Sequence, residues 1–218
     1  MKQKGYFISL EGQDASGKST IMRAVCDLLG QEGYKVKIVE EFSTSTIGDY
    51  IRSLLAKDKF IRFRTGRRSA FIETMLIIAD LYYQDEMEIL PLLADGTTVL
   101  KERHIDSIFA CQIPKIADDY PGLTYEYLYG WITDLTRFLL VPNLTFLLSL
   151  PRKIQIERIK SRGENVSDED LRVFEQREII YTDLALKHKG RIVIFDNNKT
   201  LRDASIEIAS IIKMNLSQ

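Results

Sequence analysis

Hydrophobic residues follow two different spacings along this chain, and the two spacings predict short strands separated by longer helices. Compact apolar runs, typical of strands in a buried parallel sheet, occur at Tyr6–Leu10, Lys35–Val39, Thr97–Leu100, Leu144–Leu148 and Ile192–Phe195. Apolar residues recur at helical spacing over Lys18–Leu29, Ile47–Leu55, Ser69–Leu93, Asp106–Ile116, Thr124–Leu139, Pro151–Ser161, Asp168–Lys187 and Asp203–Met214. Strands alternating with helices indicate βαβ units and a mainly parallel sheet.

This order of elements predicts an α/β protein with three α/β/α layers around a five-stranded sheet. No repeat, low-complexity tract or linker interrupts the pattern, so we expect one domain over residues 1–218. In open parallel sheets, ligands bind beyond the carboxyl ends of the strands. We therefore expect the functional residues at those strand ends.

Composition and charge narrow the classes of partner. The net charge of −1 predicts no broad attraction to nucleic acid or to a membrane surface. No apolar run approaches the length of a membrane span, and the first residues do not resemble a secretory signal. The two cysteines, Cys26 and Cys111, have neither metal-binding nor redox spacing. We expect a cytoplasmic protein with reduced thiols.

A glycine-rich segment joins the first predicted strand to the first predicted helix. It fits the pattern G-x-x-x-x-G-K-[ST] without a gap. Glycines let backbone N–H groups surround a phosphate, and the helix N-terminus adds its positive dipole. The lysine would reach the β- and γ-phosphates of ATP, and the serine would ligate Mg²⁺. The residues expected to bind ATP are Gly12, Gln13, Asp14, Ala15, Ser16, Gly17, Lys18, Ser19 and Thr20.

Further segments resemble the thymidylate kinase family over roughly residues 4 to 210. The loop with its flanking residues Leu10, Glu11 and Thr20 is similar to the family's E-G-x-D-x-x-G-K-S-T opening. Lys101-Glu102-Arg103-His104, followed by Ser107 and Gln112, resembles its D-R-[YH]-x-x-S…Q segment. Pro142–Thr145 with Leu148 resembles the family's P-D-L-T strand, and Arg158 with Arg162-Gly163 resembles its R-x-x-x-R-G lid entry. Ile47-Gly48 with Arg52 and Leu55 resembles its I-G-x-x-[IL]-R-x-x-L helix.

The resemblance implies a P-loop NTPase fold and an ATP- and Mg²⁺-dependent nucleotide kinase, with dTMP as the family's usual acceptor. A lid would cover about residues 161–172, and a homodimer would form through the helix around Met75 to Ile78. The residues implied for catalysis are Asp14, Lys18, Arg103, Arg158 and Arg162, and those for the metal are Ser19 and Glu102. The residues expected at the acceptor are Glu41, Arg52, Ile77, Arg103, Ser107, Gln112 and Tyr181.

The sequence departs from the family where the acceptor base is recognised. The family carries a phenylalanine that stacks on thymine and an arginine four residues later, whereas this chain has Ile77 and Leu81. If each lost contact contributes about 1–3 kcal/mol, thymine binding through these two positions would be weaker by several kcal/mol.

Two other functions remain open at this level. Glu41 after the second strand, together with Glu102-Arg103, resembles the site of deoxynucleoside kinases, in which a carboxylate activates a 5′-hydroxyl. A monophosphate acceptor would be repelled by Glu40 and Glu41 unless arginines compensate, for example in the basic stretch Lys57, Lys59, Arg62, Arg64, Arg67 and Arg68. A nucleotide-binding regulator without turnover is the third reading, although the chain retains the residues that stabilise phosphate charge.

Overall fold

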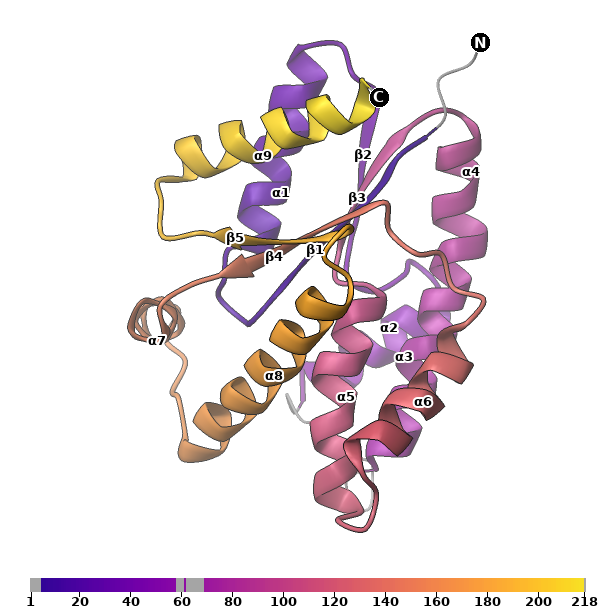
Figure 1. Cartoon of the computed structure of the whole chain (residues 1–218), viewed down its shortest axis with the longest axis vertical. Coiled ribbons are helices and arrows are strands. Elements are labelled where there is room, and N and C mark those ends of the chain that lie inside the picture. Colours follow the sequence, from indigo (N-terminus) through magenta and orange to yellow (C-terminus); the bar gives the residue numbers. More distant parts are fainter. Residues whose placement is uncertain (1–4, 58–60, 62–68, 218) are drawn as a thin grey trace.

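The computed structural model describes residues 5–57, 61 and 69–217, and their centre is a five-stranded sheet (Figure 1). The strands lie in the order β2-β3-β1-β4-β5, and every neighbouring pair is parallel. Their bounds are β1 Phe7–Gly12, β2 Val36–Val39, β3 Thr98–Glu102, β4 Leu144–Ser149 and β5 Ile192–Asp196. The predicted α/β fold and its strands are confirmed. All carboxyl ends lie at one edge of the sheet.

Helices cover both faces of this sheet, because successive strand residues point to opposite sides. On one face, Ile8 and Leu10 belong to an apolar core that includes residues of α1 (Lys18–Gln31) and α9 (Leu201–Leu216). On the other face, Leu147 packs in a second core with α3 (Ala70–Gln84), α5 (Ile105–Asp119), α6 (Tyr125–Thr136) and α8 (Asp168–Lys187). Figure 1 shows these two groups of helices separated by the sheet. Helices α2 (Thr46–Leu55), α4 (Leu90–Ala94) and α7 (Arg152–Ser161) lie outside these two cores.

The long helix expected at Ser69–Leu93 contains an irregular turn. Helix α3 continues through a π-helical turn (Asp85–Ile89) into α4 (Leu90–Ala94). Pro91 lacks the N–H that would bond to the carbonyl four residues earlier, and its ring crowds that carbonyl. This gives a physical reason for the wider turn. The turn places the Asp85 carboxylate within hydrogen-bond distance of Leu140 N (2.7 Å) and His104 Nε2 (3.0 Å).

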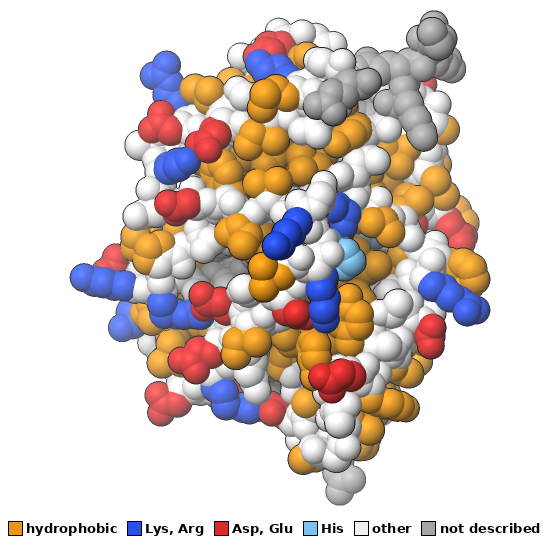
Figure 2. Space-filling view, viewed as in Figure 1, with side chains coloured by type: hydrophobic (Ala, Val, Ile, Leu, Met, Phe, Trp, Pro, Cys, Tyr) orange, Lys and Arg blue, Asp and Glu red, His pale blue; other side chains and the backbone are white. Residues whose placement is uncertain are grey.

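Charged side chains are interspersed over the face shown in Figure 2, where basic and acidic groups alternate between apolar areas. The described helices include none that is both long and apolar enough to cross a bilayer.

Candidate phosphotransfer site

The glycine-rich loop connects β1 to α1 as the motif requires, and its backbone explains the glycines. Gly12 has a φ of 132° and Gly17 a φ of 95°. A Cβ at Gly12 would lie 2.6 Å from the carbonyl oxygen of Leu148, and one at Gly17 would lie 2.9 Å from Asn197 Nδ2. Both positions therefore exclude a side chain on conformational and steric grounds.

Three side-chain hydrogen bonds join the loop to distant elements. Asn197, after β5, donates from Nδ2 to Ser16 O at 2.6 Å. Gln155 of α7 donates from Nε2 to the carbonyl of Asp14 at 3.1 Å. Gln13 donates from its own Nε2 to Phe174 O in α8 at 2.7 Å. These bonds occupy loop carbonyls and one loop side chain, so they fix the loop's shape without using the amides that would face a phosphate.

Lys18 is buried and folds back over its own loop. Its Nζ donates to the carbonyls of Gly12 (3.3 Å) and Gln13 (3.0 Å). Burial and the nearby Arg103 together lower the pKa of Lys18 to about 8, although the surrounding carboxylates oppose the shift. The ammonium group is thus held by neutral oxygens, which an anionic phosphate can replace with a stronger partner.

Ser19, in the first turn of α1, lies next to Glu102, the last residue of β3. The Ser19 hydroxyl donates to Glu102 Oε2 at 2.7 Å. Among the described residues, no group of three or more His, Cys, Asp or Glu side chains could hold a metal. Mg²⁺ typically takes only one or two protein oxygens and completes its shell with water and substrate phosphate. This hydroxyl–carboxylate pair beside a phosphate loop has the donor chemistry that such an ion requires.

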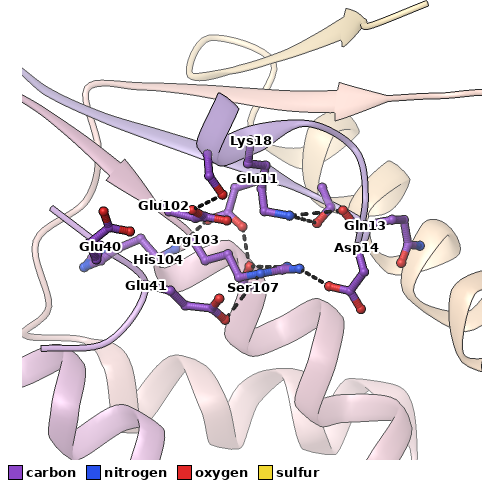
Figure 3. Close-up of polar contacts among 12 residues, drawn as sticks. Glu11, Gln13, Asp14, Lys18, Glu40, Glu41, Glu102, Arg103, His104 and Ser107 are labelled. Carbon is purple, nitrogen blue, oxygen red and sulfur yellow. Dashed lines mark hydrogen bonds and ion pairs between the residues drawn. The ribbon is translucent and has the colours of Figure 1, made fainter. Parts of the chain in front are cut away.

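Arg103 occupies the centre of the site, directly after β3 (Figure 3). Its φ of 55° is in the left-handed region, which turns the chain away from the strand direction. The guanidinium contacts Asp14 Oδ1 from Nη2 (2.7 Å) and Glu41 Oε1 from Nε (3.4 Å). Nη1 lies 3.3 Å from both Ser107 Oγ and Tyr181 OH. These four partners hold the cation at the strand edge that faces the loop.

A second arginine, Arg177 of α8, shares the same carboxylate and was not identified from the sequence. Its Nη1 lies 3.3 Å from Asp14 Oδ2. Its Nε is buried and has no hydrogen-bond partner in the described part of the chain. Burial raises the pKa of Asp14, but Arg103, Arg177 and Lys18 outweigh it and hold that pKa well below its usual range. The helical spacing of Arg177 and Tyr181 is the sequence signal that could have placed both on one face of α8.

Glu11 lies beneath these arginines and is fully buried. It accepts hydrogen bonds from His104 N (2.7 Å), from Ser107 Oγ and from Tyr181 OH (3.3 Å). Burial and the nearby Asp106 together raise the pKa of Glu11 to about 7, although the bond from Ser107 opposes the shift. Tyr181 was expected at the acceptor; its hydroxyl instead joins the network that supports Arg103.

Lys101 organises the neighbouring strand end. This side chain is fully buried in β3, and its Nζ donates to the carbonyls of Glu40 (2.8 Å) and Glu41 (3.0 Å). Burial lowers the pKa of Lys101 to about 8 against the pull of surrounding carboxylates. The loop after β2 is thereby fixed so that Glu41 faces Arg103. No such role is expected of Lys101 from the sequence, because a lysine in a strand is ordinarily solvent-exposed.

A cavity of about 440 Å³ opens between the loop, β3, α3, α5 and the segment before α8. Its lining contains most of the residues expected at the site: Asp14, Ala15, Gly17, Lys18, Ser19, Thr20, Glu41, Ile77, Glu102, Arg103, Ser107, Gln112 and Arg162. Leu81, Glu73, Lys115 and Arg177 also line it. The residues expected to bind the donor and those expected to bind the acceptor therefore face one common space.

Some expected residues lie outside this lining. Arg52 is half-exposed and bonds Phe42 O (3.1 Å) and Asp49 Oδ1 (2.5 Å), so it supports the loop after β2. Arg158 Nη1 lies 3.5 Å from Ala15 O, on the outer side of the phosphate loop. Of the basic stretch considered for the acceptor, Lys59, Arg62, Arg64, Arg67 and Arg68 lie outside the described residues.

Comparison with known proteins gives a consistent result. Residues 10–208 match the family model described as thymidylate kinase. A probable thymidylate kinase of Pyrococcus abyssi is 33% identical over 177 residues, which is 81% of this chain and 80% of that relative. A probable thymidylate kinase of Pyrococcus horikoshii is 28% identical and a thymidylate kinase of a Sulfurihydrogenibium species 29% identical, each match covering 98% of both chains.

Proposed function

We propose that this chain, which belongs to the thymidylate kinase family and is therefore an ATP-dependent nucleotide kinase, transfers the γ-phosphoryl group of ATP to dTMP. The proposal rests on the observation that two sets of groups suited to bind phosphate lie on either side of Asp14. Lys18 and the loop amides lie on one side, and Arg103 with Arg177 lies on the other. Two anionic phosphate groups brought to these two positions would face each other across the cavity.

The donor side is the phosphate loop. The amides at the N-terminus of α1 and the Lys18 ammonium bind the β- and γ-phosphates, because both lie where the loop opens into the cavity. Ser19 and Glu102 are the residues that would hold Mg²⁺. When bound, the ion neutralises phosphate charge and orients the oxygens of the transferring group.

The acceptor side is the arginine pair. A guanidinium binds a phosphate through two parallel N–H groups, and Arg103 and Arg177 together supply more positive charge than a neutral hydroxyl acceptor needs. Asp14 and Glu41 neutralise this charge before the acceptor binds. This balance supports a monophosphate acceptor over a nucleoside and gives Glu41 the role of holding Arg103 rather than of activating a 5′-hydroxyl.

Catalysis then depends on position and electrostatics, since phosphoryl transfer needs no covalent intermediate. Arg162 enters the cavity from the segment after α7, together with Glu164, Asn165 and Val166. Residues 161–172 act as a lid that excludes water when closed. Arg162 neutralises charge on the transferring group, and Arg158 supports the loop beneath it.

The proposal includes a cytoplasmic homodimer. Ile72 and Met75 project from α3 with 51% and 46% of their surfaces exposed, and apolar side chains on a helix face are suited to packing against a second copy.

A coupled ADP-release assay with Mg-ATP tests the reaction against a panel of deoxynucleosides and their monophosphates. We expect turnover with dTMP and none with thymidine. Turnover with nucleosides alone would contradict the proposal and would identify Glu41 as the base. Absence of turnover across the whole panel would contradict kinase activity toward nucleotides of this class.

A further inference from the structure

Two helices form the walls of the cavity, and each presents one stripe of residues to it. On α3 the stripe is Glu73, Ile77 and Leu81, which are spaced by four residues and therefore lie on one face. On α5 it is Ser107, Cys111 and Lys115 at the same spacing, with Ile108 and Gln112 beside them. The middle of both stripes is largely apolar. The end far from Arg103 is polar and charged.

The distance from Arg103 to the charged far end of the two stripes is similar to the length of a nucleotide. Ser107 contacts Arg103, and Lys115 follows it by eight residues, so the charged far end lies about 12 Å further along the axis of α5. This span is comparable with that from the 5′-phosphate to the outer edge of a pyrimidine in an extended nucleotide. A phosphate on Arg103 would place the ring between Ile77 and Ile108 and its hydrogen-bonding edge at the far end.

The far end has a defined order of donors and acceptors. Glu73 is buried, and its Oε1 accepts from Gln112 Nε2 at 3.2 Å and pairs with Lys115 Nζ. The carboxylate thus lies between two donors. Within the described part of the chain, Glu73 Oε2 accepts no hydrogen bond, and both the amide and the ammonium have further N–H groups to donate. Gln112, Glu73 and Lys115 therefore present a donor, an acceptor and a donor, in that order.

We propose that Gln112, Glu73 and Lys115 recognise the imide edge of thymine or uracil. That edge presents acceptor, donor, acceptor, through O4, N3–H and O2, and is the complement of the set on the protein. Cytosine presents donor, acceptor, acceptor and leaves a buried donor and acceptor of the set mismatched, which is costly. The inference rests on the proposed function and adds the residues that select the base.

The position of the Lys115 charge also explains how the base can be recognised although Ile77 and Leu81 replace the family's phenylalanine and arginine. Both residues are apolar walls here, so no cation can reach the base from α3. Lys115 approaches from α5 instead, and the Glu73 carboxylate fixes its ammonium, only 19% of the lysine side chain being exposed. In this chain the cation that contacts the base is therefore on α5 and not on α3.

The test compares kcat/KM for dTMP, dUMP and dCMP in the wild type and in Lys115→Met and Glu73→Gln. We expect each variant to lose about 10- to 100-fold in kcat/KM for dTMP and dUMP, mainly through KM, as for a hydrogen bond to a charged group. The KM for ATP stays constant and the dTMP-to-dCMP preference falls by a similar factor. Lys153→Met, exposed on α7 and outside the cavity lining, serves as the matched control.

Removing one partner of a buried ion pair can unfold a protein, whereas replacing both partners by apolar residues is often neutral or stabilising. The double variant Glu73→Leu/Lys115→Met therefore keeps the test decisive, and its folding is checked by thermal denaturation. A folded double variant that retains the wild-type dTMP-to-dCMP ratio overturns the inference alone. A wild type that phosphorylates no monophosphate overturns the proposed function and the base assignment with it.

Discussion

Asp14 and Arg103 form an ion pair of 2.7 Å between the phosphate loop and the end of β3. The pair joins the two halves of the site before any nucleotide is present. Because a guanidinium makes a stronger bidentate contact with phosphate than with a single carboxylate oxygen, this pair is suited to exchange for an acceptor phosphate. The first two predictions test that exchange.

Arg103→Ala should raise the KM for the acceptor by about 10- to 100-fold, the loss expected for hydrogen bonds to a charged group. The KM for ATP should change far less, because Lys18 and the loop amides remain in place. Steady-state kinetics with each substrate varied separately measures both values, with Arg103→Lys as a variant that keeps the charge but loses the fork. A defect confined to ATP would move Arg103 to the donor side.

Arg177→Ala should also weaken acceptor binding, because its contact with Asp14 places a second cation at the same position and its Nε has no partner among the described residues. We expect a rise in acceptor KM of about 10-fold, the lower end of the range for charged hydrogen bonds. Arg172→Ala is the matched control, since Arg172 lies on the same helix and pairs with Asp118 at the surface. Equal effects of the two substitutions would show that Arg177 acts only on the stability of α8.

Lys18→Ala should lower kcat by about 100- to 1000-fold, as for other groups that stabilise charge in a transition state. The fold should persist, because Lys18 bonds only to carbonyls of its own loop. Circular dichroism and thermal denaturation measure folding beside the kinetics. Arg23→Ala, an exposed change on the same helix, is the control. Full activity of Lys18→Ala would refute the mechanism.

Nucleotide affinity should fall as the pH rises above about 8. Burial lowers the pKa of Lys18 to about 8, so the free protein carries a charged Lys18 below this value and a neutral one above it. Only the charged form attracts phosphate, and binding is therefore strongest below pH 8. Calorimetric titration with ADP at several pH values measures this. Lys18→Arg, which stays charged, should bind with little pH dependence over the same range, and an unchanged profile would assign the titration to another group.

Lys101→Met should reduce the free energy of unfolding by about 1–3 kcal/mol, because the carbonyls of Glu40 and Glu41 lose a buried donor. The acceptor KM should rise as well, since Glu41 is then free to leave Arg103. Urea denaturation measures the first effect and kinetics the second. Lys37→Met on the exposed side of β2 is the control. A more stable Lys101→Met variant with unchanged kinetics would show that the cost of burying the lysine exceeds the value of its bonds.

The fold could be predicted from the amino-acid sequence alone, because the signals that specify it are local. Apolar runs and helical spacing gave the strands and helices, and strands alternating with helices permit few arrangements other than a parallel sheet. The phosphate loop was equally readable: Gly12 and Gly17 need positive φ, and Lys18 and Ser19 follow at fixed spacing. Each of these features depends on neighbours within a few residues.

Tertiary structure decided the rest, because the remaining contacts join residues far apart in the chain. Arg177 could be identified as a candidate site residue only from the structure, because α8 places it beside Asp14, which is 163 residues away in sequence. Lys115 and Glu73 are ordinary helix residues until α3 and α5 pack against each other and bury their charges together. Burial depends on how the helices and the sheet pack together. A buried unpaired donor or a buried paired carboxylate indicates a functional site because burying such groups costs free energy. The sequence could therefore place the phosphate chemistry, and only the packed helices could place the groups proposed to select the base.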